Sequence, residues 1–344
     1  MPGLSATDRA TERLAWVRQT LGDDALTLES ASADASFRSY WRSYHSKRSW
    51  IVMDSPPALE DPAPWLALGQ RLAAAGLHVP EVRAADLERG FLLIEDLGTR
   101  MYLPELSDAT VDRLYGDALA ALLRMQSACG IDGLAPYDRA FLARELAIMP
   151  EWFLGRHLGV TLDDDELATL DEAFAVLLDN ALAQPIVFVH RDFHSRNLLV
   201  IDSDAPLASP GIIDFQGALA GPITYDLASL LRDCYIAWPR ERVEDWAEGY
   251  RVQLRQAGLI DEAVDAATFL RWLDLTGLQR HIKVLGIFCR LHYRDGKRGY
   301  LGDLPRVFDY VIDVAAGYPA LQPLADLLAS YAGDRDLTRA VAEA

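Results

Sequence analysis

The first hundred residues alternate between apolar and polar positions over short distances. Leu14, Val17 and Leu21 recur at helical spacing behind Asp8, which can serve as an N-cap, and predict a helix over 7–21. Strands are predicted where aromatic and β-branched residues alternate with polar ones between brief turns. These strands cover 25–30, 36–46, 48–54, 79–88 and 90–96, with one helix inserted at 61–76.

After Gly98 the apolar positions follow a longer, helical period. Helices are predicted over 108–129, 138–155, 163–183, 223–236, 240–257, 264–294 and 304–331. The exception lies between Pro185 and Phe215, where three short apolar runs (IVFV, LLVI and GIIDF) predict strands of a small sheet. Loops on such a sheet are a common place for polar chemistry.

The length of the chain agrees with this change of pattern. A single hydrophobic core usually stops growing at about 250 to 300 residues, and the chain has 344. We therefore expect an α+β protein with two lobes, a small β-rich one over residues 1–97 and a larger, mostly helical one over residues 98–344.

Composition and charge narrow the function classes. The chain is 51% hydrophobic and 24% charged, which is typical of a globular protein. Its formal net charge of −18 argues against nucleic acid and against an anionic membrane surface as partners. A phosphorylated ligand would need local positive charge, and no obligate protein partner is evident.

The N-terminal residues and the cysteines indicate a cytoplasmic protein. The start lacks the basic and apolar regions of a signal peptide, and no apolar run is long enough to span a membrane. Cys129, Cys234 and Cys289 are too few and too scattered for a disulfide framework, so we expect buried thiols.

The chemistry of the chain is concentrated in one loop sequence. Residues 190–197 read HRDFHSRN, which has the form H-R-D-x-x-x-x-N, and Asp214 follows within Ile-Asp-Phe. Phosphoryl transfer needs a carboxylate for the acceptor hydroxyl and further oxygen ligands that hold Mg²⁺ against nucleotide phosphates. Asp192 fits the first role, and Asn197 and Asp214 fit the others. A chance match of four fixed positions is expected in only roughly a few chains per thousand.

These residues resemble the protein-kinase fold, but the continuation does not match the A-P-E segment of protein kinases. The sequence GPITYDLA at 221–228 is instead similar to the stretch that follows the metal aspartate in the aminoglycoside phosphotransferase-like family. The segments VHRDFHSRNLLV, IIDFQGALAGPITYDLASLLRDCY, IVMDSPP and GLQRHIKVLGIFCRLHYRDGKRGYL resemble, within that family, the sugar kinases of peptidoglycan recycling. The resemblance covers nearly the whole chain.

The resemblance implies a function that composition alone does not show. It implies ATP-dependent phosphorylation, with Mg²⁺, of the anomeric hydroxyl of N-acetylmuramic acid or N-acetylglucosamine to the sugar 1-phosphate. It also implies that Asp226 is a buried carboxylate that supports the catalytic loop together with His190, and that Glu95 and Leu97 lie at the adenine. A charge at a helix N-terminus is the alternative role for Asp226.

Two features depart from the general kinase pattern. Met53 occupies the strand position of the phosphate-binding lysine, and the helix at 61–76 carries no glutamate to pair with such a lysine. Arg38, Arg42 and Arg48 are possible substitutes that the sequence does not rank. The expected nucleotide loop, 30–36, has no glycine; Ser32 and Ser36 could donate to phosphate, or the segment could be an ordinary polar turn.

The remaining candidates concern the acceptor. A basic stretch between 279 and 306 places Arg280, Lys283, Arg290 and Arg294 on one helical face. Such a face is solvated by default; the alternative is that it lines the sugar cleft and binds the lactyl carboxylate of N-acetylmuramate. Further candidate substrate contacts are His194, Arg196 and Gln216, with loop packing as the alternative for the first two.

Two other functions stay open at this point. An acceptor such as an aminoglycoside or an amino alcohol would keep the fold, although a cationic acceptor should prefer an acidic cleft. A nucleotide-binding scaffold without turnover is suggested by Met53. Retention of Asp192, Asn197 and Asp214 together argues against that scaffold.

Overall fold

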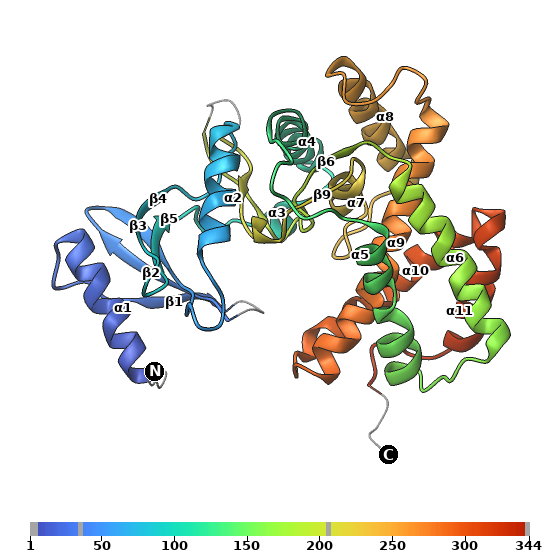
Figure 1. The fold of residues 1–344 in the computed structure, drawn as a ribbon, viewed down its shortest axis with the longest axis horizontal. Coiled ribbons are helices and arrows are strands. Elements are labelled where there is room, and N and C mark those ends of the chain that lie inside the picture. The colour runs from blue at the N-terminus through green and yellow to red at the C-terminus, as the bar shows by residue number, and fades with distance from the viewer. Residues whose placement is uncertain (1–5, 34–36, 204–207, 341–344) are drawn as a thin grey trace. The chain divides into compact units, whose positions relative to one another are not determined.

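The computed structural model describes residues 6–33, 37–203 and 208–340 (Figure 1). The chain forms two compact units: unit 1 is built from 1–124 and 196–216, and unit 2 from 125–195 and 217–344. The first passage between them lies within helix α4 (Val111–Ala128). The functional lobes expected at 1–97 and 98–344 stay a prediction.

Unit 1 contains a five-stranded antiparallel sheet with the strand order β1-β2-β3-β5-β4. Its strands are β1 (Glu29–Ala33), β2 (Ser39–His45), β3 (Arg48–Asp54), β4 (Val82–Asp86) and β5 (Phe91–Glu95). The helices of this unit outside α4 are α1 (Ala6–Leu21), α2 (Ala63–Ala74) and the short α3 (Tyr102–Glu105). A two-stranded sheet of β7 (Leu198–Leu199) and β8 (Gly211–Ile212) completes it.

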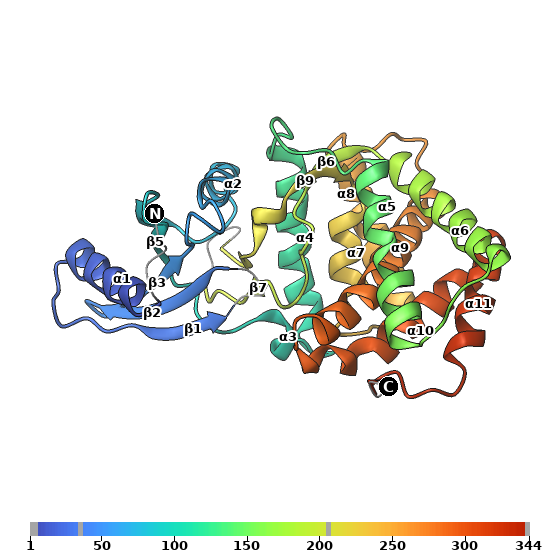
Figure 2. The same cartoon turned by 60° about the horizontal axis from the view of Figure 1, so that its bottom comes forward.

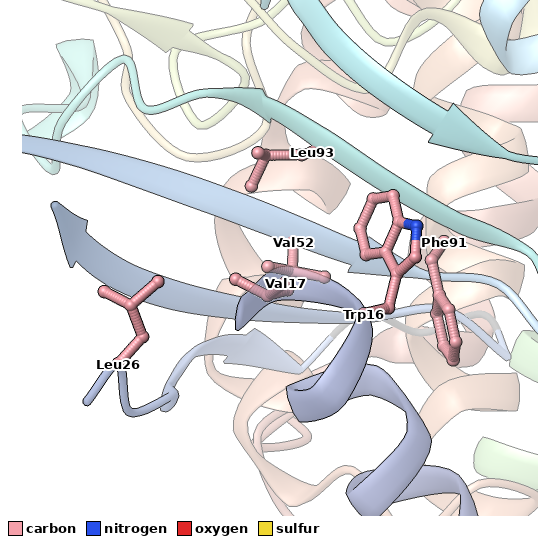
Figure 3. Close-up of a cluster of buried hydrophobic side chains, with 6 residues drawn as sticks. All are labelled: Trp16, Val17, Leu26, Val52, Phe91 and Leu93. Atoms are coloured by element: carbon pink, nitrogen blue, oxygen red, sulfur yellow. The ribbon is translucent and has the colours of Figure 1, made fainter. Parts of the chain in front are cut away.

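Helix α1 covers one face of the five-stranded sheet. Trp16 and Val17 of α1 pack on Val52 of β3 and on Phe91 and Leu93 of β5, all of them buried (Figure 3). Figure 2 shows α1 lying along the strands of this sheet. The helical period of 7–21 and the alternation of the strands thus meet in one core.

Unit 2 is mostly helical and is built around the long helix α9 (Ala266–Tyr293). Its other helices are α5 (Arg139–Leu146), a π-helical segment (Pro150–His157), α6 (Asp164–Leu182), α7 (Tyr225–Leu231), α8 (Arg240–Gln256), α10 (Leu304–Ala316) and α11 (Gln322–Ala332). Short 3₁₀ segments occur at Arg298–Asp303 and Pro319–Leu321. Helix α9 packs against α5, α6, α7, α8 and α10 (Figure 1). Strands β6 (Ile186–Val189) and β9 (Leu219–Pro222) pair antiparallel in this unit.

The helical period of the sequence continues through several positions at which one helix ends and another begins. The helix predicted over 304–331 is two helices, because Gly317 ends α10 and Pro319 opens a separate turn. The helix predicted over 138–155 divides likewise at Pro150, where the π-helical segment begins.

Other predicted boundaries are also wrong. Helix α7 ends at Leu231, five residues before the predicted end. Strand β1 begins at Glu29, because the preceding residues do not pair in the sheet; Leu26 among them is buried in the core. The runs between Pro185 and Phe215 belong to two separate strand pairs rather than one small sheet.

No helix in the described ranges is both long enough and apolar enough to span a membrane.

Candidate active site

The loop that follows β6 is held at its start by Asp226. Its carboxylate accepts hydrogen bonds from the backbone N–H groups of His190 (2.7 Å) and Arg191 (2.9 Å). Burial raises the pKa of Asp226 to about 7, against the lowering effect of these two hydrogen bonds. Arg191 has a positive φ of 79°, a conformation that side-chain-bearing residues rarely adopt and that the two bonds stabilise.

A second buried carboxylate holds the same loop further along. Asp233 Oδ2 accepts from Ser195 N at 2.9 Å and from Ser195 Oγ at 2.5 Å. Its other oxygen, Oδ1, accepts from Tyr235 N at 3.0 Å. Asp192 therefore lies between two fixed points of the loop.

Asp192 opens into a cavity of about 310 Å³ in unit 2, which we call the α9 cavity. Four cationic side chains and two acidic ones line this cavity, in addition to His194, Tyr235 and apolar residues. The cationic residues are Arg191, Arg280, Lys283 and Arg290; the acidic ones are Glu145 and Asp192. In a chain with a net charge of −18 the α9 cavity is a local excess of positive charge.

This positive charge keeps Asp192 ionised. Burial acts to raise the pKa of Asp192, but Lys283, His194, Arg191 and Arg280 outweigh it and hold the pKa below its usual range. An ionised carboxylate can accept the hydrogen bond of a substrate hydroxyl and take its proton as transfer proceeds.

Glu145 is the counter-charge of the α9 cavity. Its Oε1 lies 2.8 Å from Lys283 Nζ and 2.7 Å from Arg191 Nη2. Tyr137 donates its hydroxyl proton to the other carboxylate oxygen, and its own hydroxyl oxygen accepts from Tyr225 Oη at 2.9 Å. Burial acts to raise the pKa of Glu145, but Lys283, Tyr137 and Arg191 keep it below the usual range.

The basic face of α9 is only partly solvated. Arg280 and Lys283 are buried, so the default interpretation of the stripe as solvent-facing charge is wrong for these two residues. Arg280 donates to the backbone oxygen of Arg191 at 3.3 Å, within the catalytic loop. Arg294, by contrast, is exposed at the end of α9 and pairs with Asp295 at 2.7 Å.

Arg290 differs from the other cations of the α9 cavity in forming neither a hydrogen bond nor an ion pair within the described residues. It lines the α9 cavity, its Nε is buried, and within the described residues its guanidinium makes no hydrogen bond or ion pair. A half-buried guanidinium in this state favours an anionic group supplied by a ligand.

A second cavity of about 440 Å³ lies in unit 1 and is called the unit 1 cavity below. Its walls include apolar side chains from the sheet and from 199–213. They also include Glu95, the last residue of β5, and Asp96 and Leu97, which follow it. Asn197, Asp214 and Arg196 line it as well. The two predicted metal ligands and the predicted adenine segment thus share one cavity within one unit.

Asp214 is oriented by its own segment. It has a positive φ of 66°, and its Oδ1 accepts from Gln216 Nε2 at 2.6 Å. The amide oxygen of Gln216 is buried and has no hydrogen-bond donor in the described part of the chain. A buried amide oxygen without a donor next to a carboxylate is a favourable environment for a cation.

Met53 lies on the cavity side of the sheet. Neighbouring residues of a strand point to opposite faces, and Val52 packs under α1, so Met53 faces away from α1. Arg42 pairs with Ile51 across β2 and β3 and therefore shares the face of Met53. Both Arg42 and Ile51 line the unit 1 cavity.

The structure ranks the three arginines that could replace the missing lysine. Arg38 is buried with Glu60 at 3.3 Å, and Arg48 is exposed on β3. Arg42 lines the cavity, but its guanidinium is engaged by Asp96 at 2.6 Å and 3.1 Å. The cations that line the unit 1 cavity are therefore Arg42 and Arg196.

The structure also gives the positions of the other residues predicted to contact the nucleotide or the acceptor. Ser32 lies in β1, where its backbone pairs with Tyr40, while Ser36 lies outside the described residues. Glu95 is turned to His78 at 3.2 Å, which raises the pKa of His78. Arg196 and Gln216 belong to unit 1 with the metal residues, whereas His194 lines the α9 cavity.

Sequence reasoning missed three functional side chains. Glu145, Asp233 and Tyr235 reach the loop or its cavity from distant segments; Asp233 and Tyr235 lie at the end of IIDFQGALAGPITYDLASLLRDCY, but the resemblance of that segment gave neither residue a role. Tyr235 contacts His194 edge to face at 5.5 Å between ring centroids. The only available clue was the acidic residue in Arg-Asp-Cys-Tyr, directly after a helix whose predicted end was too late.

The comparisons with known proteins agree with this geometry. The family described as "Phosphotransferase enzyme family" matches residues 27–272. The chain therefore belongs to this phosphotransferase family, and the prediction of a kinase with a hydroxyl acceptor is confirmed.

Close relatives are named N-acetylmuramate/N-acetylglucosamine kinase. The one from Pseudomonas aeruginosa is 46% identical over 88% of both chains. The one from Pseudomonas putida is 45% identical over the same shares, and the one from Neisseria meningitidis is 40% identical over 94% of this chain and 96% of its own.

Solved structures support the fold at lower identity. An ethanolamine kinase from Plasmodium vivax superposes with a TM-score of 0.61 at 10% identity, covering 90% of this chain and 96% of its own. An ADP-bound aminoglycoside phosphotransferase gives 0.58 at 16% identity, covering 94% and 99%. The predicted fold class, a kinase-like aminoglycoside phosphotransferase fold, is confirmed.

Proposed function

We propose that the protein transfers the terminal phosphoryl group of ATP to the anomeric hydroxyl of N-acetylmuramic acid and N-acetylglucosamine. The observation that carries the proposal is Asp192, an ionised carboxylate in a cationic cavity, held by Asp226 and Asp233 on either side of it in the loop. The relatives at 40% to 46% identity support the choice of sugar.

Asp192 accepts the hydrogen bond of the anomeric hydroxyl and orients its oxygen for in-line attack. As the bond from that oxygen to phosphorus forms and the bond to the leaving diphosphate breaks, the hydroxyl proton moves to the carboxylate. Little covalent chemistry is left for the protein, so positioning and charge neutralisation supply most of the rate. His194 and Tyr235 enclose the acceptor in the α9 cavity.

The nucleotide is assigned to the unit 1 cavity. The segment from Glu95 to Leu97 is placed at the adenine, and Arg42 and Arg196 offer positive charge to the phosphates. The residues present fit Mg²⁺, which prefers hard oxygen ligands. Asp214 and Asn197 carry such oxygen atoms, and so does Gln216, whose amide oxygen accepts no hydrogen bond in the described part of the chain. When bound, Mg²⁺ would neutralise phosphate charge and order the terminal phosphoryl group.

The charge of the α9 cavity bears on the choice of acceptor. Cationic side chains outnumber acidic ones there, which disfavours aminoglycosides and amino alcohols, because these acceptors carry positive charge. N-acetylmuramate carries a lactyl carboxylate, and we assign this group to Arg290, a cavity cation that forms no hydrogen bond or ion pair within the described residues. N-acetylglucosamine lacks the carboxylate and makes no such contact.

A panel of acceptors tests the proposal. The purified protein is incubated with ATP and Mg²⁺ and with N-acetylmuramate, N-acetylglucosamine, kanamycin or choline, and products are identified by ³¹P NMR. We expect sugar 1-phosphates, whose phosphorus couples to the anomeric proton. Phosphorylation of kanamycin or choline with both sugars silent would contradict the proposal. A cytoplasmic location and independence of a protein partner stay predictions.

A further inference from the structure

A cavity of about 640 Å³ in unit 2 has no part in the proposed reaction. It lies where α10 faces the segment after α7, and we call it the α10 cavity. Arg232, Trp238 and Arg306 line it, as do Asp274 and Tyr310. Its size is that of a small-molecule site.

Arg232 is the unusual group in this cavity. The residue is only 6% exposed, and within the described ranges none of its guanidinium N–H groups donates a hydrogen bond or joins an ion pair. Its charge rests over the ring of Tyr310, 4.5 Å from the centroid. A buried guanidinium without an acceptor is costly and is normally compensated by an anion.

The other arginines of the cavity are satisfied. Arg240 binds Asp274 through two hydrogen bonds of 2.6 Å and 2.8 Å. Arg306 donates to Asp303 at 3.0 Å and to the backbone oxygen of Cys234 at 3.2 Å. The demand for an anion therefore comes from Arg232.

The exposed part of the cavity favours a cationic group instead. Asp309 and Asp313 lie one turn apart on α10, both line the cavity and both are exposed. Neither forms an ion pair or a hydrogen bond in the described part of the chain, although Asp313 acts on Arg232 through space. Two adjacent free carboxylates repel a dianion such as phosphate and attract an ammonium group.

We propose that the α10 cavity is a second ligand site, which binds a small zwitterion through a carboxylate at Arg232 and an ammonium group at Asp309 and Asp313. Ligands of this class are α-amino acids, amino acids with a longer chain between the two charged groups, and dipeptides. Trp238 and Tyr310 provide apolar surface for the part between the two charges.

The site is linked through the backbone to the catalytic loop. Arg232 and Trp238 line the α10 cavity, whereas Cys234 and Tyr235 line the α9 cavity, and Asp233 between them holds Ser195. One short segment thus connects the zwitterion site to the residues around Asp192.

Thermal unfolding of the full chain tests the proposal without use of its activity. The probes are glycine, 4-aminobutyrate and alanyl-alanine, compared with acetate and ethylamine at matched ionic strength. We expect at least one zwitterion to raise Tm by about 2 °C or more at saturation, beyond either control. The shift should vanish in Arg232→Met and in the double variant Asp309→Asn with Asp313→Asn, and should persist in Asp171→Asn, an exposed carboxylate on α6.

The stability of unliganded Arg232→Met separates a ligand site from a structural one. Replacing an uncompensated buried charge by an apolar side chain should leave Tm unchanged or raise it. If Arg232→Met loses several degrees or does not fold, and no zwitterion stabilises the unaltered protein, the guanidinium is a structural partner of Tyr310 and the proposal is overturned. A zwitterion shift that survives in the double aspartate variant also overturns it.

Discussion

Asp233 binds Ser195 twice, because one carboxylate oxygen accepts both the backbone N–H (2.9 Å) and the hydroxyl (2.5 Å) of that serine. Both residues are buried. The contact joins the end of α7 to the catalytic loop across 38 residues of sequence, and Asp226 makes the comparable contact at the start of the loop. Two buried carboxylates thus fix the loop on either side of Asp192.

Asp233→Asn should lower kcat and destabilise the fold. The amide has an oxygen at only one of the two acceptor positions, against Ser195 or against Tyr235 N, and its nitrogen meets a donor at the other position, so a buried N–H or O–H loses its acceptor. We expect a loss of about 1 to 3 kcal/mol in the free energy of unfolding, measured by urea denaturation. Ser195→Ala is the control: it removes only the hydroxyl and should cost less in both kcat and stability. Equal stability of Asp233→Asn and the unaltered protein would contradict this role.

Asp192→Asn should abolish nearly all turnover and leave ATP affinity within a few fold. The carboxylate acts on the acceptor hydroxyl in the α9 cavity, whereas the nucleotide is assigned to residues of unit 1. Single-turnover rates and ATP titrations on the same preparation measure both quantities. A variant that keeps half of the original rate would rule out the assignment.

Asp214→Ala should lose both activity and the part of ATP affinity that depends on Mg²⁺. The substitution removes a charged oxygen ligand from the unit 1 cavity and leaves Gln216 without its partner. ATP is titrated with and without Mg²⁺, and Asp202→Ala, an exposed carboxylate outside the cavity, serves as control. An unchanged metal-dependent increment would make Asp214 a structural residue.

The parts of the site that could be predicted are those coded locally. Asp192, Asn197 and Asp214 stand at fixed short spacings between apolar strands, so residue type and order are sufficient to propose them as site residues, and the structure places each of them at a cavity. Asp233 and Glu145 could not be found in this way, because their partners depend on how α5, α7 and α9 pack. A lone acidic residue in a helical segment has no distinguishing pattern.

The fold shows the same division. The strands at 39–45 and 48–54 and the helix α6 were predicted closely, because alternation or helical period and a capping aspartate coincide there. The long helix predicted over 304–331 was wrong, because the apolar period continues through Gly317 and Pro319 although the backbone does not. Burial of Arg280 and Lys283 was equally hidden, since the compensating Glu145 lies on another helix.

Lys283→Gln should move the acidic limb of the pH profile to higher pH. In the unaltered protein the lowered pKa of Asp192 keeps the carboxylate ionised at acidic pH, so protonation of this group should lower kcat/KM only below the ordinary pKa range of an aspartate. Lys283 is the strongest of the groups that lower this pKa, so its removal lets burial raise the pKa. At a given acidic pH less Asp192 is then ionised, and activity is lost earlier as the pH falls.

The measurement for Lys283 is the midpoint of the acidic limb of kcat/KM for N-acetylglucosamine, which does not depend on the height of the plateau. Arg294→Gln, at the exposed end of α9, should leave the midpoint unchanged. An identical midpoint in Lys283→Gln and the unaltered protein would show that the lysine does not act on the ionisation of Asp192.

Arg290→Ala should discriminate between the two sugars. Arg290 lines the α9 cavity and forms no hydrogen bond or ion pair in the described part of the chain, and N-acetylmuramate brings a carboxylate that N-acetylglucosamine lacks. A charge-assisted hydrogen bond to that carboxylate is worth about 1.5 to 3 kcal/mol, which corresponds to roughly a 10-fold to 150-fold loss in kcat/KM. The loss should affect N-acetylmuramate only. Arg294→Ala removes a paired, exposed charge from the same helix and should change neither sugar. The losses are measured at low and at moderate salt. Equal losses for both sugars in Arg290→Ala would mean that Arg290 maintains the shape of the cavity and does not bind the lactyl carboxylate. The same comparison in Arg280→Ala would then test whether Arg280 binds that carboxylate.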